Sequence, residues 1–195
     1  MFEMTNINLE DADLIYYPAL FTKEECQYYF DQLLNAVDWQ QDEIRLFGKT
    51  YDQPRLTALY ANNKNPYSYS GITMHPNAFD AKLLDIKLKV EAATKEKFSS
   101  CLLNLYRDGN DSNGWHADDE IELGTNPVIA SVSFGAERMF HLKHKTKSDL
   151  RHKIILQNGS LLLMKGETQH HWLHQVPKTK KVVGKRINLT FRSIK

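Results

Sequence analysis

The 195-residue sequence contains only two cysteines, Cys26 and Cys101, and no apolar run that approaches the length of a membrane helix. A secreted scaffold held by disulfides would carry more cysteines, so we expect a reducing compartment: the cytoplasm, or the nucleus if the source is eukaryotic. A membrane helix needs about 20 apolar residues, and residues 1–11 lack the basic start and apolar run of a signal peptide. We therefore expect no membrane association, and we expect a monomer.

The sequence also has almost no net charge, because its 25 Lys and Arg residues are balanced by 24 Asp and Glu residues. The overall charge therefore does not point to a nucleic-acid partner, although its distribution is more suggestive. Residues 178–195 contain seven Lys or Arg and no acid, and residues 138–153 contain six with only Asp149 against them. Two interpretations stay open: a phosphate-binding face, or ordinary solvent-exposed loops and strands.

The first half of the chain favours helices. A chain of this length is most simply one domain with a substantial core. Thr22 and Glu25 form a capping-box pattern, which predicts a helix that begins there and runs to about Val37. A second helix is expected over about 78–94, where a partial alternation of apolar residues also leaves a strand open.

The second half favours strands. Asn158-Gly159 is a strong hairpin signal and predicts that the two strands beside it pair with each other. Helices followed by antiparallel strands indicate an α+β chain with a jelly-roll core of two sheets. The expected strands are 100–106, 128–134, 153–157, 160–165 and 182–194.

Two histidines and one acid form a candidate metal site. His116 and Asp118 are two residues apart, so both side chains point to the same side of an extended segment. A third ligand must come from another strand, and we choose His174. Two histidines and a carboxylate suit ferrous iron and leave coordination positions open. Alone, the His-x-Asp pair is a weak signal, because a polar surface turn has the same pattern.

The last expected strand carries a second set of polar residues. Arg186, Asn188, Thr190 and Arg192 share one face at a period of two, and apolar residues occupy the other face. This polar face is either exposed to solvent or a donor-rich surface that matches carboxylates. Such a surface beside iron points to an oxygenase that uses 2-oxoglutarate. Two further residues, Asn104 and Tyr106, are placed to add hydrogen bonds to the same small acid.

The remaining histidines of the second half do not form a convincing ligand set. Two of them are adjacent, which turns them to opposite sides in a strand. We interpret all of them as polar loop residues rather than as a second metal site. They are His141, His144, His152, His170 and His171.

Five segments resemble, in order and spacing, the AlkB family of dioxygenases, and most of all the branch of human AlkB homologues that repair alkylated DNA. Each segment alone is unspecific, but together they are specific, and the resemblance covers roughly residues 40–195. The segments are Asn104-Leu105-Tyr106-Arg107-Asp108-Gly109, Gly114-Trp115-His116-Ala117-Asp118-Asp119-Glu120, Ser131-Val132-Ser133-Phe134-Gly135, His174-Gln175-Val176-Pro177 and the stretch from Arg186 to Arg192.

The resemblance implies a fold and a cofactor site. The fold would be one dioxygenase domain, with N-terminal helices and a nucleotide-recognition lid in residues 1–95 and a double-stranded β-helix, or jelly-roll, core in residues 96–195. His116, Asp118 and His174 would hold Fe(II). The two carboxylates of the cosubstrate 2-oxoglutarate would pair with the two arginines of the last strand. Helping residues would be Asn104, Tyr106, Asn188 and Thr190, beside Arg186 and Arg192.

The resemblance also implies contacts with a target base. Asp119, the acid after the metal-binding Asp118, would contact the base. Tyr67-Ser68-Tyr69-Ser70-Gly71 occupies the place of the segment that lines the base pocket. Its aromatic rings, together with His116, would sandwich a flipped base.

A hairpin around Phe47 would contact the duplex. Phe47, with Gly48 beside it, would fill the gap left by the flipped base, and Lys49 would meet a phosphate. The alternative is that Phe47 is a core residue in a turn. Basic residues after His174 are placed to touch the backbone phosphates. They are Lys178, Lys180 and Lys181.

The activity implied by the resemblance is oxidative demethylation of N-alkylated DNA bases, with release of formaldehyde, succinate and CO2. The expected lesions are 1-methyladenine and 3-methylcytosine, and Asp119 would favour such cationic bases by its charge. Two alternatives stay open. One is the same oxygenase chemistry on RNA or on a protein side chain, and the other is a nucleic-acid binding module with a vestigial metal site.

Overall fold

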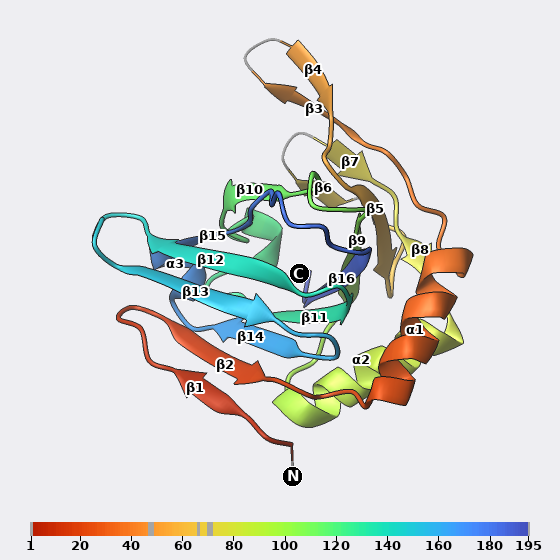
Figure 1. The fold of residues 1–195 in the computed structure, drawn as a ribbon, viewed down its shortest axis with the longest axis horizontal. Coiled ribbons are helices and arrows are strands. Elements are labelled where there is room, and N and C mark those ends of the chain that lie inside the picture. The colour runs from red at the N-terminus through yellow and green to blue at the C-terminus, as the bar shows by residue number, and fades with distance from the viewer. Residues whose placement is uncertain (1, 47–48, 66, 70–71, 195) are drawn as a thin grey trace.

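The computed structural model describes residues 2–46, 49–65, 67–69 and 72–194, and within them the chain is mostly β with few helices (Figure 1). Sixteen strands form two larger sheets and two small hairpins in this part of the chain. None of the described helices is both long and apolar enough to cross a membrane. Figure 1 shows α1 and α2 together at one side of the molecule, while the β3–β4 hairpin projects from it.

Helix α1 (Lys23–Ala36) confirms the capping-box prediction. The Thr22 side chain accepts a hydrogen bond from the backbone of Glu25, whose carboxylate accepts one from the Thr22 backbone at 2.7 Å. Both bonds satisfy donors that the first helical turn leaves without partners. The helix ends before Val37, which is extended.

Helix α2 (Ala81–Thr94) confirms the second helix, and excludes a strand there. It starts later than expected because Asp80 is the N-cap, with its carboxylate accepting from the backbone of Leu83 at 2.8 Å. It ends at Lys95, which adopts a left-handed conformation with φ 65°.

The large sheet has eight strands and contains the centre of the fold. All neighbouring strands are antiparallel except β5 and β8, which are parallel. The order in space is β1 (Thr5–Ile7), β2 (Asp13–Tyr17), β14 (Leu161–Lys165), β11 (Ile129–Gly135), β16 (Arg186–Arg192), β9 (Ser100–Tyr106), β5 (Leu56–Ala61) and β8 (Asn77–Ala78).

The small sheet has four antiparallel strands, and two hairpins stand apart from both sheets. Short helices η1 (Ile121–Leu123) and α3 (Thr168–His171) lie in connections around the small sheet. The small sheet has the order β10 (Asn113–His116), β15 (Trp172–Val176), β12 (Arg138–His144) and β13 (Arg151–Leu156). The hairpins are β3 (Glu43–Leu46) with β4 (Lys49–Asp52), and β6 (Tyr67–Tyr69) with β7 (Ile72–Met74).

Two hydrophobic cores cover the two faces of the large sheet. On one face, Leu33 of α1 and Ile86 of α2 belong to the same cluster as Leu103, Phe134 and Leu189 of the sheet. The helices therefore cover this face and bury apolar side chains, which is the main source of stability for such a layer.

The other core lies between the two sheets. Ile129 and Leu162 of the large sheet share a cluster with Phe140, Leu142 and Trp172 of the small sheet. The two sheets therefore pack face to face, and any polar side chain between them must be satisfied there.

The hairpin prediction at Asn158-Gly159 is wrong. β13 pairs with β12 in the small sheet, whereas β14 pairs with β11 and β2 in the large sheet. The turn thus carries the chain from one sheet to the other. Gly159 has φ +78°, and its backbone bonds to Phe21 and Ser133 rather than closing a ladder. The signal identified the turn but not the partners, because pairing depends on distant segments.

Candidate functional site

A single pocket between the two sheets gathers the predicted metal and cosubstrate residues. The large sheet contributes residues from β9 and β16, and the small sheet contributes residues from β10, β12 and β15. The predicted residues that line the pocket are Asn104, Tyr106, His116, Asp118, His174, Arg186, Asn188, Thr190 and Arg192.

The candidate metal ligands meet where β10 pairs with β15. His116 lies opposite His174 in this pairing, with ring centroids 4.2 Å apart, and Asp118 follows just after the strand. One nitrogen or oxygen atom from each of the three residues lies within 4.8 Å of the other two. Such a cluster of two imidazoles and one carboxylate can hold a divalent metal ion.

Hydrogen bonds orient two of these ligands. Nδ1 of His116 lies 2.7 Å from the carbonyl oxygen of Gly114, so Nδ1 carries the proton and Nε2 keeps its lone pair. The backbone N–H of Asp118 donates to Oε1 of Gln169 at 2.9 Å, and Gln169 is fully buried. The metal-facing atoms are thus held in position by their neighbours.

The electrostatics of the pocket keep the ligands deprotonated. Burial alone would raise the pKa of Asp118, but the charges of Arg192 and the two histidines outweigh it and lower the pKa to about 2. Burial lowers the pKa of His174 to about 3, and it also lowers the pKa of His116. A metal ion binds neutral imidazole and ionised carboxylate, so the cluster suits a metal at neutral pH.

Arg186 offers a site for an anion. Burial lowers its pKa to about 10, so the guanidinium is still charged at neutral pH. One nitrogen, Nη2, donates to Oγ of Ser133 at 2.9 Å, and the guanidinium stacks over the ring of Tyr106 at 5.1 Å. Within the described chain, its Nε and Nη1 atoms are buried without a hydrogen-bond partner. A carboxylate in the pocket would accept a hydrogen bond from Nε or from Nη1, which lie on different edges of the guanidinium, and this fits 2-oxoglutarate.

The alternating pattern of β16 is confirmed. Its four polar residues line the pocket, and Ile187, Leu189 and Phe191 belong to the core under the helices. The amide group of Asn188, however, already donates to Oγ of Ser131 at 2.8 Å and to the Val132 carbonyl at 2.9 Å. Asn188 therefore first connects β16 to the neighbouring strand β11.

Sequence reasoning missed Arg55, which also lines the pocket. It lies just before β5 and is only 4% exposed. Its Nε donates to Oδ1 of Asn104 at 2.8 Å, and its Nη1 donates to the Ser112 carbonyl at 3.3 Å. The sequence offers no periodic or spacing signal for Arg55, because its partners lie far along the chain.

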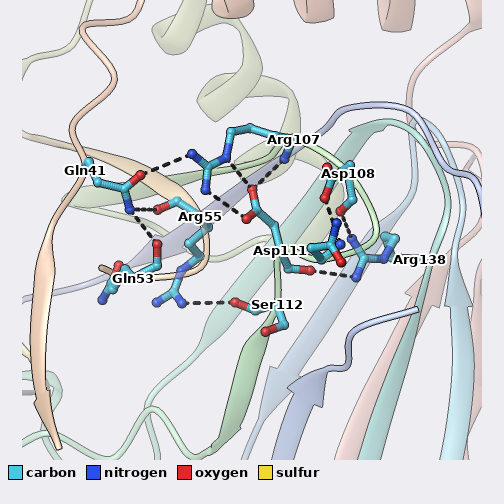
Figure 2. A network of polar contacts seen from close by, with 9 residues as sticks. Gln41, Gln53, Arg55, Arg107, Asp108, Asp111, Ser112 and Arg138 are labelled. Carbon is cyan, nitrogen blue, oxygen red and sulfur yellow. Dashed lines mark hydrogen bonds and ion pairs between the residues drawn. The ribbon is translucent and has the colours of Figure 1, made fainter. Parts of the chain in front are cut away.

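Figure 2 shows how Arg55 belongs to a polar network at the root of the β3–β4 hairpin. The guanidinium of Arg107 donates two hydrogen bonds, of 2.8 and 2.9 Å, to the carboxylate of Asp111. It also donates to Oε1 of Gln41 at 3.2 Å. Gln41 in turn donates to the Gln53 carbonyl. Gln41 and Gln53 flank the hairpin, so the network attaches both hairpin ends to the connection between β9 and β10.

The residues predicted to contact the target base and the duplex do not line the pocket. Phe47 and Gly48 lie outside the described residues, and Lys49 is exposed in β4. The segment Tyr67–Tyr69 forms β6, which pairs with β7. Asp119 is half exposed and is not among the residues that line the pocket.

A second cluster of potential ligands corrects the interpretation of His144. This residue is buried in β12 rather than in a loop, and its Nε2 lies 3.2 Å from Oδ2 of Asp11, close to His171. Its Nδ1 accepts from the backbone of Thr146 and Lys147, so the proton of the neutral ring sits on Nε2. That nitrogen then lacks a lone pair for a metal, and the cluster is a hydrogen-bonded anchor.

Comparisons with known proteins agree with this geometry. Residues 13–192 match the model of the 2OG-Fe(II) oxygenase superfamily. The alpha-ketoglutarate-dependent dioxygenase alkB homolog 3 of Bos taurus is 44% identical over 186 residues, which cover 91% of this chain and 64% of the bovine protein. The DNA oxidative demethylase ALKBH2 of Homo sapiens is 39% identical over 188 residues, covering 91% of this chain and 72% of the human protein.

Solved structures agree on the fold. The structure of OsALKBH1 superposes with a TM-score of 0.67 at 16% sequence identity, covering 97% of this chain and 100% of that chain. At this identity the likeness concerns the fold alone. The chain spans less than two thirds of the length of the bovine alkB homolog 3.

Proposed function

The chain belongs to the AlkB family of 2OG-Fe(II) oxygenases, and we propose that it is an oxidative demethylase of N-alkylated bases in DNA. Its preferred lesions would be 1-methyladenine and 3-methylcytosine, and its products formaldehyde, succinate and CO2. The observation that carries this proposal is the pocket between the sheets. In this pocket, two histidines and an aspartate that could hold a metal ion lie beside a buried arginine, two of whose nitrogens have no hydrogen-bond partner among the described residues.

We propose that His116, Asp118 and His174 hold the Fe(II) that the family requires. When bound, iron and 2-oxoglutarate together supply the oxidation of a methyl C–H bond by dioxygen. The chain itself supplies position and charge. Arg192 donates to Oδ1 of Asp118 at 2.9 Å, which holds the carboxylate ionised and fixed beside the two rings.

In this proposal Arg186 pairs with one carboxylate of 2-oxoglutarate and Arg192 with the other. Asn104, Tyr106, Asn188 and Thr190 line the same pocket and help to hold the cosubstrate. Arg186 is 1% exposed, so a carboxylate there would be shielded from water, and its hydrogen bonds to the guanidinium would be correspondingly strong.

We also propose that the two sheets form a double-stranded β-helix, or jelly-roll, in one dioxygenase domain across residues 1–195. Residues 96–195 would form its catalytic core, and residues 1–95 the N-terminal helices and the nucleotide-recognition lid. The core shared by the two sheets supports this arrangement. Strands β1, β2, β5 and β8 of the first part complete the large sheet.

The lid in this proposal consists of the two hairpins. Asp119 would contact the target base together with Tyr67, Ser68 and Tyr69 of β6. Phe47, which with Gly48 lies between β3 and β4 in the sequence, would insert into the duplex, and Lys49 would meet a phosphate. Basic residues that follow β15 would meet further phosphates, and all three are exposed. They are Lys178, Lys180 and Lys181.

The direct test is turnover of defined oligonucleotides. Purified protein is incubated with Fe(II), 2-oxoglutarate, ascorbate and oligonucleotides that carry one 1-methyladenine or 3-methylcytosine. We expect stoichiometric formaldehyde, succinate and restored base. Absence of all three, while a homologous demethylase works in parallel, would overturn the proposal. Equal tests on RNA and on methylated peptides decide whether either substrate replaces DNA.

The hairpin has its own test. Phe47→Ala is expected to lower turnover of duplex DNA more than turnover of single strands, because only the duplex leaves a gap for an aromatic wedge to fill. Equal losses on both substrates would instead favour Phe47 as a core residue.

A further inference from the structure

The acid proposed to contact the base already has a cationic partner. Oδ2 of Asp119 lies 3.1 Å from Nζ of Lys145, which follows β12. The two side chains are 50% and 28% exposed, so a ligand can reach the ion pair, and Asp119 directly follows Asp118, which lines the pocket. A base that approaches Asp119 therefore meets two opposite charges rather than one.

Lys145 is held in place without the help of Asp119. Its Nζ also donates to the backbone carbonyl of Gln169 at 2.9 Å, and its own backbone N–H donates to the carbonyl of His171 at 2.7 Å. When a ligand engages Asp119, these two bonds keep the ammonium group nearby.

The same anchor connects Lys145 to the metal ligands. Gln169, whose carbonyl holds Lys145, uses its side chain to hold the backbone of Asp118 at 2.9 Å. The ammonium therefore has a fixed position near both the base-contacting acid and the metal cluster.

We propose that Lys145 is a specificity-determining residue: its ammonium offsets the charge of Asp119, so that neutral methylated bases are accepted beside cationic ones. This inference rests on the proposed function of the same site. Without Lys145, Asp119 would present an uncompensated negative charge, which attracts a cationic base and does nothing equivalent for a neutral one. With Lys145, Asp119 keeps its capacity to accept hydrogen bonds, but the charges of the two side chains offset each other.

The expected size of the effect follows from distance and exposure. Two charges a few ångströms beyond contact, at a partly exposed rim, change affinity by about three- to tenfold, and salt screens part of this. The effect concerns the preference between substrates, not the total activity.

The test compares two pyrimidine lesions that carry the methyl group on the same ring nitrogen. 3-Methylcytosine is cationic at neutral pH and 3-methylthymine is neutral. Each is placed once in the same single-stranded sequence, and kcat/KM is measured for both with wild type, Lys145→Met and Lys145→Arg. For Lys145→Met we expect the ratio of 3-methylcytosine to 3-methylthymine to rise about three- to tenfold, and to fall back toward wild type as salt is raised. Lys145→Arg keeps the charge and should keep the wild-type ratio.

A matched control comes from the same turn. Lys147 pairs with Glu10 and Asp11, away from Asp119, so Lys147→Met removes a nearby cation of the same type and should leave the ratio unchanged. If Lys145→Met folds poorly, Lys145→Gln removes the charge while keeping a donor for the Gln169 carbonyl, and it should shift the ratio in the same direction.

Two failures have different signatures. If wild type turns over neither lesion, the proposed function itself fails. If wild type is active but the ratio is the same in Lys145→Met, Lys145→Gln and wild type, the inference about Lys145 is overturned and the proposed function stands. A fall of both rates by the same factor would assign Lys145 a merely structural role.

Discussion

Asp118 and Asp119 are neighbours in the sequence, and each forms an ion pair, but the two pairs lie in different surroundings. Asp118 and Arg192 are 2.9 Å apart with side chains 4% and 8% exposed, deep in the pocket. Asp119 and Lys145 are 3.1 Å apart with side chains 50% and 28% exposed, and neither residue lines the pocket. Breaking a buried pair leaves an uncompensated charge without water, whereas an exposed pair contributes little to stability.

The same contrast separates larger parts of the molecule. Every residue of β9 and β16, which carry the residues proposed to bind the cosubstrate, is buried, and every residue of β4 is exposed. The floor of the pocket is therefore fixed by the packing of the whole domain. Strand β4, in the proposed lid, buries no side chain, so its residues can vary without loss of the fold.

The largest expected effect comes from replacing each aspartate in turn. Asp118→Ala should reduce demethylation by more than about 10³-fold, since it removes a proposed metal ligand. It should also lower the free energy of unfolding by about 3–5 kcal/mol, because Arg192 stays buried without this partner. Asp119→Ala should cost less than about 1 kcal/mol. Urea unfolding measures the stability of each variant, and formaldehyde assays measure its activity. Equal losses of stability in the two variants would contradict the contrast between the buried and the exposed ion pair.

A second effect isolates the anion site. Arg186→Met should raise the KM for 2-oxoglutarate by about 100-fold, since hydrogen bonds to a charged group contribute about 1.5–3 kcal/mol each. Arg186→Lys should also bind 2-oxoglutarate weakly, because the ammonium group of lysine cannot reproduce the planar, two-donor geometry of the guanidinium. Stability should change little, since an apolar group of similar size replaces a buried charge. Unchanged KM with lower stability would make Arg186 a structural residue only.

A third effect concerns pH and the metal-free protein. Burial lowers the pKa of His174 to about 3 in the folded state, below the value of about 6.5 expected in the unfolded chain. The folded state thus binds this proton more weakly. Stability from this group is complete above pH 6.5 and is lost as pH falls toward 3, by up to about 1.4 kcal/mol per pH unit.

Thermal unfolding in the presence of a chelator measures this dependence. The melting temperature should fall by about 2–4 °C per pH unit below 6. His174→Gln should flatten the slope, whereas His170→Gln, at an exposed position, should not. A slope that persists in His174→Gln would contradict the assignment.

The smallest expected effect concerns the hairpin root. Arg107→Met removes the hydrogen bonds to Asp111 and Gln41 that hold the root of the β3–β4 hairpin in position. The KM for DNA should therefore rise a few-fold, while the KM for 2-oxoglutarate stays constant. Lys97→Met is the matched control, because Lys97 also pairs with a buried acid, Glu91, on the far helix α2. A rise of both constants would show that the network supports the whole pocket instead.

Local signals predicted much of this structure. The capping box at Thr22 placed the start of α1, and the alternation in residues 186–192 assigned each side chain of β16 to the correct face. Both signals depend on neighbouring residues, since a cap spans one helical turn and a strand alternates with every residue.

Features that depend on distant contacts were not predictable in the same way. Asn158-Gly159 marks a turn, but its strands pair with segments elsewhere in the chain. Arg55 reaches the pocket only because β5 lies beside β9. His144 is buried because Asp11, more than a hundred residues earlier, lies against it. A single sequence carries no local pattern for such pairings.

The position of β16 has a consequence for how the protein is made. This strand lies between β11 and β9 in the large sheet, although the ribosome produces it long after both. Until it emerges, β9 and β11 each expose an unpaired edge, which favours association with other chains and engagement by chaperones. Because β16 also carries Arg186 and Arg192, two of the arginines that line the pocket, completion of the sheet and assembly of the pocket are one event during biosynthesis.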